Sequence, residues 1–225
     1  MNLVHESIHR INKTDVLTLE HRLSTVTRLD VKAPSGYNRV FCLYFDRNRD
    51  FSMIEGTMGA YKRDEYRICY YNQNPNVLFL SRKSEMNGMS SIDTCEVTAQ
   101  FVDTILRGDF SAAISDPMGR TGDDLDPLIQ EFYWEVVGKG LRPKVLVDYD
   151  SKSYLYSRGD AQITINYNPR SSSNILSFLN PCHASVPVND DKVIVHIKWN
   201  NYLPDVIRSA VTMSGYAAGT YSYMM

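Results

Sequence analysis

The chain has 225 residues, 43% of them hydrophobic, and a formal net charge of −2 with a pI near 6.2. This balance argues against a general nucleic-acid coat, which usually has a basic excess, so a phosphate site would have to be a local concentration of charge. The length favours one domain over residues 1–225, and no apolar run is long enough to suggest a membrane span. Without a secretion signal or a CxxC pair, we expect a cytoplasmic protein with reduced thiols.

The first half of the chain alternates between helix and strand patterns. Thr14 and Asp15 precede leucines at helical spacing, which predicts a capped helix to about Val26. Aromatic and β-branched residues then indicate strands over residues 40–45, 63–71 and 77–83. Apolar residues at helical spacing predict a second helix over residues 96–106.

The second half continues the alternation. Residues 116–126 combine proline, glycine and aspartate and predict a mobile loop, after which Pro127 begins a helix that Gly138 and Gly140 close. Further patterns predict strands over residues 145–149, 162–166 and 193–199, a short helix over 203–211 and a tail over 214–225. This order predicts an α+β fold dominated by antiparallel strands.

Three of these strands alternate apolar and ionisable residues. In the last one, Lys192, Ile194, His196 and Lys198 share a face, and aliphatic residues occupy the opposite face. An ordinary antiparallel sheet turns its polar face to water. Several such faces rolled into a barrel would instead enclose a polar tunnel, which attracts polyanions when it carries lysine and arginine. The alternation by itself leaves both arrangements open.

Several motifs follow one another over nearly the whole chain. They are Leu43-Tyr-Phe-Asp46, Arg63-Asp-Glu-Tyr-Arg-Ile-Cys-Tyr-Tyr71, Leu141-Arg-Pro-Lys-Val-Leu-Val-Asp-Tyr-Asp150, Ile163-Thr164, Val193-Ile-Val-His-Ile-Lys198 and Leu203-Pro204. Together they resemble the VTC (vacuolar transporter chaperone) domain, the polyphosphate polymerase module of the triphosphate-tunnel superfamily. The resemblance implies an antiparallel eight-stranded β-barrel with flanking helices. It also implies a lumen that binds polyphosphate, ATP or another triphosphate polyanion, and phosphoryl transfer from ATP.

The resemblance assigns roles to the basic side chains of the strands. In phosphoryl transfer, positioning and charge neutralisation carry the catalysis, so several cations have to converge on one substrate. Phosphate binding falls to Arg39, Arg63, Arg67, Lys83 and Lys198, of which Arg67, Lys83 and Lys198 are also the candidate catalytic residues. Arg39 enters this set because Phe41, on the same face of its strand, stands where the family has an arginine.

The chain departs from its family at several of these positions. Gln162 and Asn166 replace an arginine and an aspartate, and His196 replaces the metal-binding glutamate. Candidate ligands for Mn²⁺ or Mg²⁺ are therefore Glu6, Glu65 and His196, although imidazole suits Mg²⁺ poorly. Each missing cation also removes a charge-assisted contact to phosphate. We therefore expect the fold to be retained and the polymerase activity to be weakened or lost.

Two alternatives remain open. One is a catalytically inactive relative that acts as a binding or scaffold domain. For either role, association with a membrane partner protein is an open expectation. The other is a zinc hydrolase, because His5-Glu-Ser-Ile-His9 is a literal HExxH motif. That motif needs a helix, since histidines at these positions lie about 13 Å apart on a strand. No nucleic-acid partner is expected.

Overall fold

The computed structural model of the chain describes residues 3–30, 36–47, 63–86, 88–110, 126–158, 160–188, 192–212 and 217–218. The long strands are β1 (Val4–Asn12), β3 (Asn38–Arg47), β4 (Arg63–Tyr71), β5 (Leu78–Met86), β6 (Met89–Val97), β7 (Leu141–Tyr156), β8 (Ala161–Ser172) and β10 (Lys192–Trp199). Three short strands are β2 (Arg28–Asp30), β9 (Val186–Pro187) and β11 (Ala217–Ala218). The helices are α1 (Lys13–Val26), α3 (Ala99–Leu106), α5 (Pro127–Lys139) and α6 (Asp205–Val211), with a 3-10 turn η1 (Ile175–Ser177).

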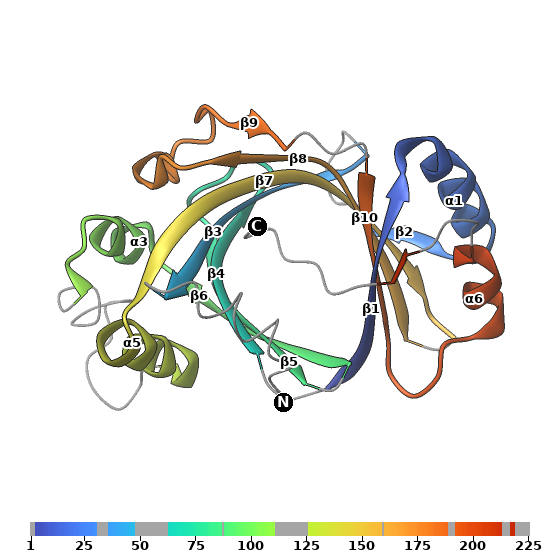
Figure 1. Cartoon of the computed structure of the whole chain (residues 1–225), viewed down its shortest axis with the longest axis horizontal. Coiled ribbons are helices and arrows are strands. Elements are labelled where there is room, and N and C mark those ends of the chain that lie inside the picture. The colour runs from blue at the N-terminus through green and yellow to red at the C-terminus, as the bar shows by residue number, and fades with distance from the viewer. Residues whose placement is uncertain are drawn as a thin grey trace.

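The long strands close into a barrel. They follow the order β7-β3-β4-β5-β6-β1-β10-β8, and the antiparallel pairing of β7 with β8 joins the two ends. Figure 1 shows this ring, with α3 and α5 on one side and α1 and α6 on the opposite side. The α+β fold with an eight-stranded antiparallel barrel and flanking helices is therefore confirmed. None of the described helices is long and apolar enough to cross a membrane.

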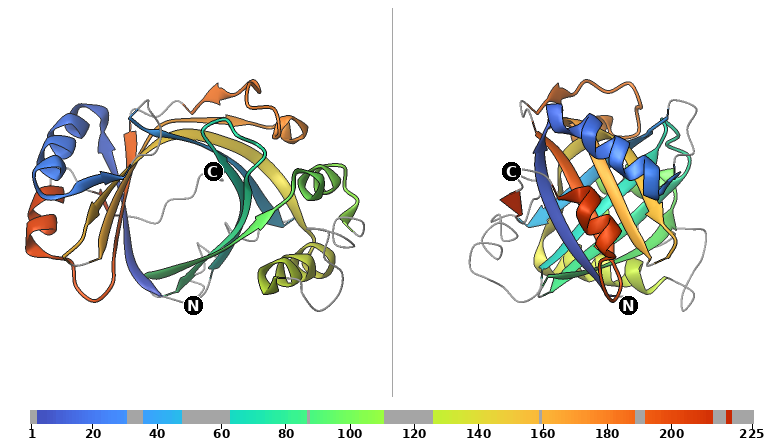
Figure 2. Two further views of the ribbon diagram at one scale, coloured as in Figure 1. Left: turned by 180° about the vertical axis from the view of Figure 1, so that it is seen from behind. Right: turned by 90° about the vertical axis from the view of Figure 1, so that its right-hand side faces the viewer.

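The large hydrophobic cores lie outside the barrel, under the helices. On one side Leu43 of β3 and Phe132 of α5 belong to a core that also includes residues of α3, β4, β5 and β6. On the other side Val195 of β10 packs with Leu19 of α1 and Ile207 of α6. Figure 2 shows α1 and α6 lying together across the outer face of the strands. Because the helices cover the aliphatic faces, the polar faces of the strands turn inward.

Strand β10 illustrates how the sequence produces this arrangement. Its side chains alternate, so Val193, Val195 and Ile197 are buried in the outer core, whereas His196 and Lys198 line the interior. The period-two pattern read from the sequence thus corresponds to a helix-covered face and a lumen face. The enclosed arrangement, and not the water-exposed sheet, is the one that the structure adopts.

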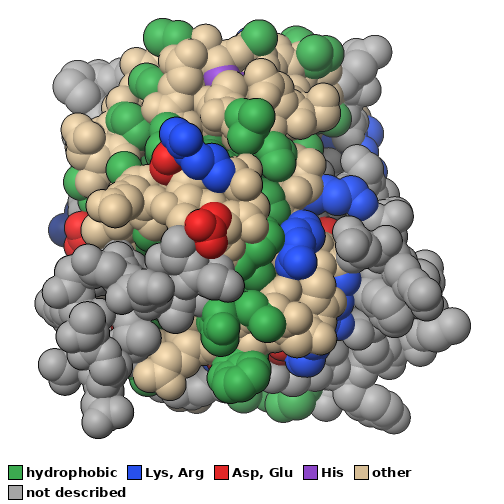
Figure 3. All heavy atoms as spheres, turned by 90° about the vertical axis from the view of Figure 1, so that its left-hand side faces the viewer, with side chains coloured by type: hydrophobic (Ala, Val, Ile, Leu, Met, Phe, Trp, Pro, Cys, Tyr) green, Lys and Arg blue, Asp and Glu red, His purple; other side chains and the backbone are tan. Residues whose placement is uncertain are grey.

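The helix ends follow local chemistry. Thr98 caps α3, its side chain accepting a hydrogen bond from the backbone N–H of Phe101, and Asp126 caps α5 in the same manner through Leu128. Gly140 ends α5 at φ +71°, a left-handed conformation that glycine adopts without strain. Both helices pack against the outer face of the barrel through their buried apolar residues. Figure 3 views that side, where hydrophobic, basic and acidic side chains are interspersed on the surface.

Two element boundaries differ from the sequence predictions. The predicted helix over residues 96–106 begins only at Ala99, because Glu96 and Val97 end the strand β6, which the sequence reading missed. The pattern of β6 is rich in serine and polar residues, so its strand signal is weak. The last helix begins at Asp205 and not at residue 203, with Pro204 as its N-cap.

Two predicted segments fall largely beyond what is described. Of the loop predicted over residues 116–126, residues 116–125 lie outside the described part, and Asp126 is the N-cap of α5. Of the tail predicted over residues 214–225, Ala217 and Ala218 are described, and they form the short strand β11 against β1.

The prediction of reduced thiols is wrong for two of the four cysteines. Cys42 of β3 and Cys69 of β4 are directly opposite each other in the strand register, and they form a disulfide. Their positions are 27 residues apart in sequence, so no local CxxC motif announces the pair. Cys95 and Cys182 are free thiols.

Candidate functional site

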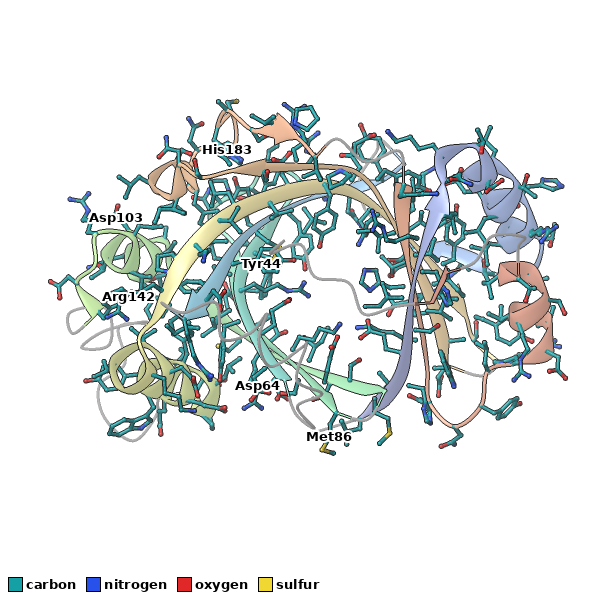
Figure 4. All side chains as sticks on the ribbon, in the orientation of Figure 1. Tyr44, Asp64, Met86, Asp103, Arg142 and His183 are labelled. Atoms are coloured by element: carbon teal, nitrogen blue, oxygen red, sulfur yellow. A yellow bond between two sulfur atoms is a disulfide. The ribbon has the colours of Figure 1, made fainter. Side chains whose placement is uncertain are left out.

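A polar cavity of about 310 Å³ occupies the lumen of the barrel. Side chains from β3, β4, β5, β6, β7, β8 and β10 line it. Tyr44, labelled in Figure 4, points from β3 into this interior. Two parts of the lining differ in their chemistry. We name these the charged wall and the neutral wall.

The charged wall spans β4, β5, β1 and β10. Its ionisable side chains are Glu6, Glu65, Arg67, Lys83, Glu85 and Lys198. Three predicted phosphate-binding residues, Arg67, Lys83 and Lys198, are thus brought together on one cavity. They come from strands far apart in the chain, and the barrel closure makes them neighbours.

Glu6 is the hub of this wall. Its side chain is 5% exposed, and its carboxylate lies 2.8 Å from Lys83 Nζ and 3.7 Å from Lys198 Nζ. His196 Nδ1 lies 3.3 Å from the same carboxylate. Lys83 also contacts Glu85, with 2.5 Å between Nζ and Oε1. Both lysines therefore already have carboxylate partners within the lumen.

These contacts change the protonation equilibria of the wall. Burial alone would raise the pKa of Glu6, but the hydrogen bond from His196 and the charges of Lys83 and Lys198 outweigh it and hold that pKa well below its ordinary value. Burial lowers the pKa of Lys198, which also faces the positive charges of Lys83 and Arg67. For Lys83, burial is outweighed by Glu6 and Glu85, and its pKa is raised. Glu6 is therefore ionised, and Lys83 is held in its charged form.

Arg67 differs from the two lysines. Its guanidinium donates a hydrogen bond from Nη1 to Tyr44 Oη at 3.3 Å, while its Nε is buried with no hydrogen-bond partner among the described residues. In the described ranges no carboxylate lies within ion-pair distance of Arg67. An arginine with spare donors in a confined site is suited to an anion.

The neutral wall consists of β7 and β8. It presents hydroxyl and amide groups in place of charges: Ser151 and Ser153 from β7, and Gln162, Thr164 and Asn166 from β8. Ser151 Oγ donates to Asn166 Oδ1 at 2.9 Å, and the hydroxyls of Ser153 and Thr164 are 3.1 Å apart. Gln162 and Asn166, at which the resemblance of the sequence implies an arginine and an aspartate, both lie on the lumen side.

His196 lies where the two walls meet. On β10 it is directly opposite Thr164 of β8 on one side and Ile8 of β1 on the other. Burial lowers its pKa, an effect that its contact with Glu6 only partly offsets, so the imidazole is neutral near pH 7. Its Nε2 is buried without a hydrogen-bond partner in the described ranges.

The placement of Arg39 in the phosphate site is wrong. Val40 and Tyr44 line the cavity, whereas Phe41 belongs to the outer core, so the odd-numbered positions of β3 face outward. Arg39 accordingly forms an ion pair with Asp148, at 2.5 Å between NH2 and Oδ2. Phe41 therefore does not mark a charge missing from the lumen, because its side chain faces the outer core. Arg63 is in β4 opposite Glu85, but its side chain lies outside the described part of the structure.

The zinc hydrolase alternative is contradicted. His5, Glu6 and His9 all lie in the strand β1, which puts Glu6 on the lumen face and both histidines on the other. His5 stacks on Trp199 with 5.5 Å between ring centroids, and His9 Nε2 lies 3.0 Å from Ser7 Oγ. A zinc ion between the histidines would therefore have no access to Glu6.

The described residues do not assemble a ready divalent-metal site. No group of three His, Cys, Asp or Glu side chains within this part of the chain is arranged to hold a metal ion. Glu6 touches His196, but both of its oxygens also contact lysines, which would repel a metal ion. Glu65 lines the cavity from β4. The donor set therefore does not fit a resident Mg²⁺ or Mn²⁺.

Sequence reasoning missed several lumen residues. Glu85 is two positions from Lys83 on β5, so the alternation that placed Lys83 inside also predicts Glu85 there. Tyr44 and Tyr149 line the cavity beside Arg67, and nothing in their aromatic patterns distinguishes lumen tyrosines from core tyrosines. Ser153 gave no signal for the same reason, because hydroxyl residues are common on both faces of strands.

Comparison with known proteins adds three findings. The family model of the VTC domain matches residues 5–222. No curated protein sequence gives a significant match. Similar solved structures include the PH1819 protein of Pyrococcus horikoshii, with 12% identity, coverage of 97% of this chain and 91% of that one, and a TM-score of 0.46. A putative adenylate cyclase from Bacillus halodurans has 12% identity, coverage of 88% and 82%, and a TM-score of 0.42. The PH1012 protein of Pyrococcus horikoshii has 11% identity, coverage of 92% and 84%, and a TM-score of 0.42.

Proposed function

The chain belongs to the VTC domain family, and we propose that its lumen binds a triphosphate-type polyanion, such as polyphosphate or a nucleoside triphosphate, through Arg67, Lys83 and Lys198. The observation that carries this proposal is the convergence of these three side chains on one cavity. Cations in a partly dehydrated cleft bind phosphate more strongly than cations on a surface. Because the net charge of the chain is near neutral, the chain as a whole does not attract polyanions, and binding depends on these lumen side chains.

Arg67 supplies the strongest anchor in this proposal. It has spare donors and no described carboxylate partner, so a phosphate oxygen displaces nothing charged when it binds there. Lys83 and Lys198 have to exchange Glu6 or Glu85 for phosphate. We therefore expect the phosphate to bind mainly at Arg67. Each lysine should contribute less binding free energy than an ammonium group without a carboxylate partner would.

The same contacts favour a binding domain with weakened or lost phosphotransferase activity. Transfer from ATP requires several cations and a metal to neutralise the reacting phosphates. Here the carboxylate of Glu6 is engaged by two lysines, and His196 replaces a metal-binding glutamate. A catalytically inactive binding or scaffold role is the second candidate function that this geometry favours. Any Mn²⁺ or Mg²⁺ would have to arrive with the phosphate and take most of its ligands from it.

Calorimetric titration of the protein with tripolyphosphate, at two salt concentrations, tests the proposal. We expect saturable binding at one site that weakens as salt rises, since screening reduces attraction between charges. Arg67→Met should weaken this binding, and Arg107→Met is its matched control, because Arg107 is an exposed arginine at the C-cap of α3. Absence of binding at low salt would refute the proposal. Incubation with ATP and Mn²⁺ separates the two roles, because polyphosphate formation would mean that the transferase survives.

A further inference from the structure

The lumen offers few free charges and many hydroxyl groups. The described charged wall has three cations, Arg67, Lys83 and Lys198, and three carboxylates, Glu6, Glu65 and Glu85. Both lysines are ion-paired with these carboxylates. Every phosphate beyond the one at Arg67 has to displace a buried ion pair. Among phosphate ligands, the charge balance thus favours those that add few phosphates to the one at Arg67.

The neutral wall complements a different kind of group. Hydroxyl and amide side chains both donate and accept hydrogen bonds, as the hydroxyls of a sugar do, whereas phosphate oxygens only accept in their ionised form. Ser153 and Thr164 currently satisfy each other at 3.1 Å. The side-chain amide of Gln162 makes no hydrogen bond within the part of the chain that the structure describes, although it lines the cavity. Gln162 therefore has two donors and an acceptor to offer a ligand.

The two walls are joined in register. Gln162 of β8 is directly opposite Lys198 of β10, and Thr164 is directly opposite His196. Neighbouring strands lie about 4.8 Å apart, so a group bound at Lys198 is within one sugar ring of Gln162 and Thr164. The unpartnered Nε2 of His196 lies in the same row. A cavity of about 310 Å³ is at the small end of small-molecule sites.

We propose that the ligand of this lumen is a phosphorylated sugar or polyol, with its phosphate at Arg67 and Lys198 and its hydroxyls on Gln162, Thr164 and Ser153. This inference rests on the proposed function, because it requires the charged wall to bind phosphate. It adds that hydroxyl groups next to the phosphate increase affinity. A bare condensed phosphate would leave the polar groups of the neutral wall without a ligand partner.

Matched pairs of ligands test the inference in the full-length protein. Calorimetry would compare inorganic phosphate with glucose 6-phosphate, and pyrophosphate with fructose 1,6-bisphosphate, and tripolyphosphate would be titrated alongside. We expect each sugar phosphate to bind about tenfold more tightly than its inorganic counterpart, as two additional hydrogen bonds would provide. Gln162→Leu should remove most of this advantage and leave pyrophosphate affinity within about twofold. Because Gln162 makes no described side-chain hydrogen bond, folding should tolerate this change.

A second pair of variants separates ligand binding from folding. Ser153→Ala with Thr164→Val removes a hydroxyl pair that lines the cavity. Ser81→Ala with Thr94→Val removes a similar pair, 3.2 Å apart on β5 and β6, which lies on the lumen side opposite Arg67 but outside the neutral wall. Only the first double variant should lower sugar phosphate affinity. If both do so equally, or if sugar phosphates show no advantage while tripolyphosphate binds, the inference is wrong and the proposed function stands. If no phosphate compound binds, both are wrong.

Discussion

The charged wall and the neutral wall line the same cavity, yet they are stabilised differently. In the charged wall, Glu6 holds Lys83, Lys198 and His196 together, so the ions neutralise one another. In the neutral wall, side-chain hydrogen bonds join neighbours across two adjacent strands, Ser151 with Asn166 and Ser153 with Thr164. The first arrangement depends on contacts between strands that are far apart in the sequence, and the second depends on one pair of consecutive strands.

This difference shows how a tunnel can retain its fold while its chemistry changes. Buried ions need partners, because removing one member of a pair leaves an uncompensated charge. A chain that loses cations from one wall therefore keeps stability if hydroxyl and amide groups replace them and if the remaining cations pair with existing carboxylates. The lumen has this composition. The strands remain paired and the helices remain packed on the outer faces, because replacing side chains in the lumen does not change these faces.

The largest effect is expected from removing the hub of the charged wall. Glu6→Gln leaves Lys198 without its described carboxylate partner and Lys83 with Glu85 alone. The free energy of unfolding should fall by about 3 kcal/mol, measured by urea denaturation at neutral pH. Asp103→Asn is the control, since it breaks an exposed ion pair between Asp103 of α3 and the C-cap residue Arg107 and should cost less than about 1 kcal/mol. Equal losses in the two variants would mean that the charged wall is not held together by Glu6.

The next effect concerns ligand affinity and not stability. Arg67→Met removes the cation that has spare donors, while the methionine keeps an unbranched apolar stem. Affinity for tripolyphosphate should fall by about 10- to 100-fold, the loss of one or two charge-assisted hydrogen bonds. Arg107→Met, at the C-cap of α3 outside the barrel, should leave the affinity for tripolyphosphate unchanged. A similar affinity in Arg67→Met and the wild type would show that the phosphate binds elsewhere.

The contrast between the walls also indicates which features the sequence could reveal. Strands with a helix-covered face and a lumen face alternate clearly, so the inward positions of Arg67, Lys83 and Lys198 were predictable. Strand β3 is buried on both faces, with Val40 and Tyr44 inside and Phe41 outside. Its pattern is a continuous apolar run that does not say which face is the lumen.

The pairing of the charges could not be predicted in the same way. Glu6 and His196 are 190 positions apart, and they meet because β1 and β10 are adjacent in the closed barrel. A sequence pattern gives the face of a strand, but the neighbour of that strand depends on the topology of the sheet. For this reason the sequence suggested available cations, whereas the structure has ion pairs. The disulfide between Cys42 and Cys69 was missed for the same reason.

An intermediate effect should appear in the pH dependence of stability. The folded-state pKa of Glu6 lies well below its ordinary value of 4.5, so the unfolded chain takes up the proton first as the pH falls. The stabilisation by Glu6 is therefore complete above about pH 4.5 and is lost progressively below it, by about 2 kcal/mol near pH 3. Urea denaturation between pH 3 and about pH 7 should show a steeper acid loss in the wild type than in Glu6→Gln. Parallel curves for the two proteins would contradict the assignment of this carboxylate.

The smallest effect is expected in the neutral wall, and it distinguishes its local bonds from the charged hub. Ser153→Ala or Thr164→Val alone leaves the other hydroxyl without its partner and should cost about 1 kcal/mol of unfolding free energy. The double variant removes both polar groups, so its cost should be smaller than the sum of the two single costs by about 0.5–1 kcal/mol. The free energies come from urea denaturation of all four proteins in the cycle. Additive costs would mean that each hydroxyl is satisfied independently by solvent in the lumen. In that case the neutral wall would be hydrated as a set of separate groups, and a sugar hydroxyl would have to displace water at each of them.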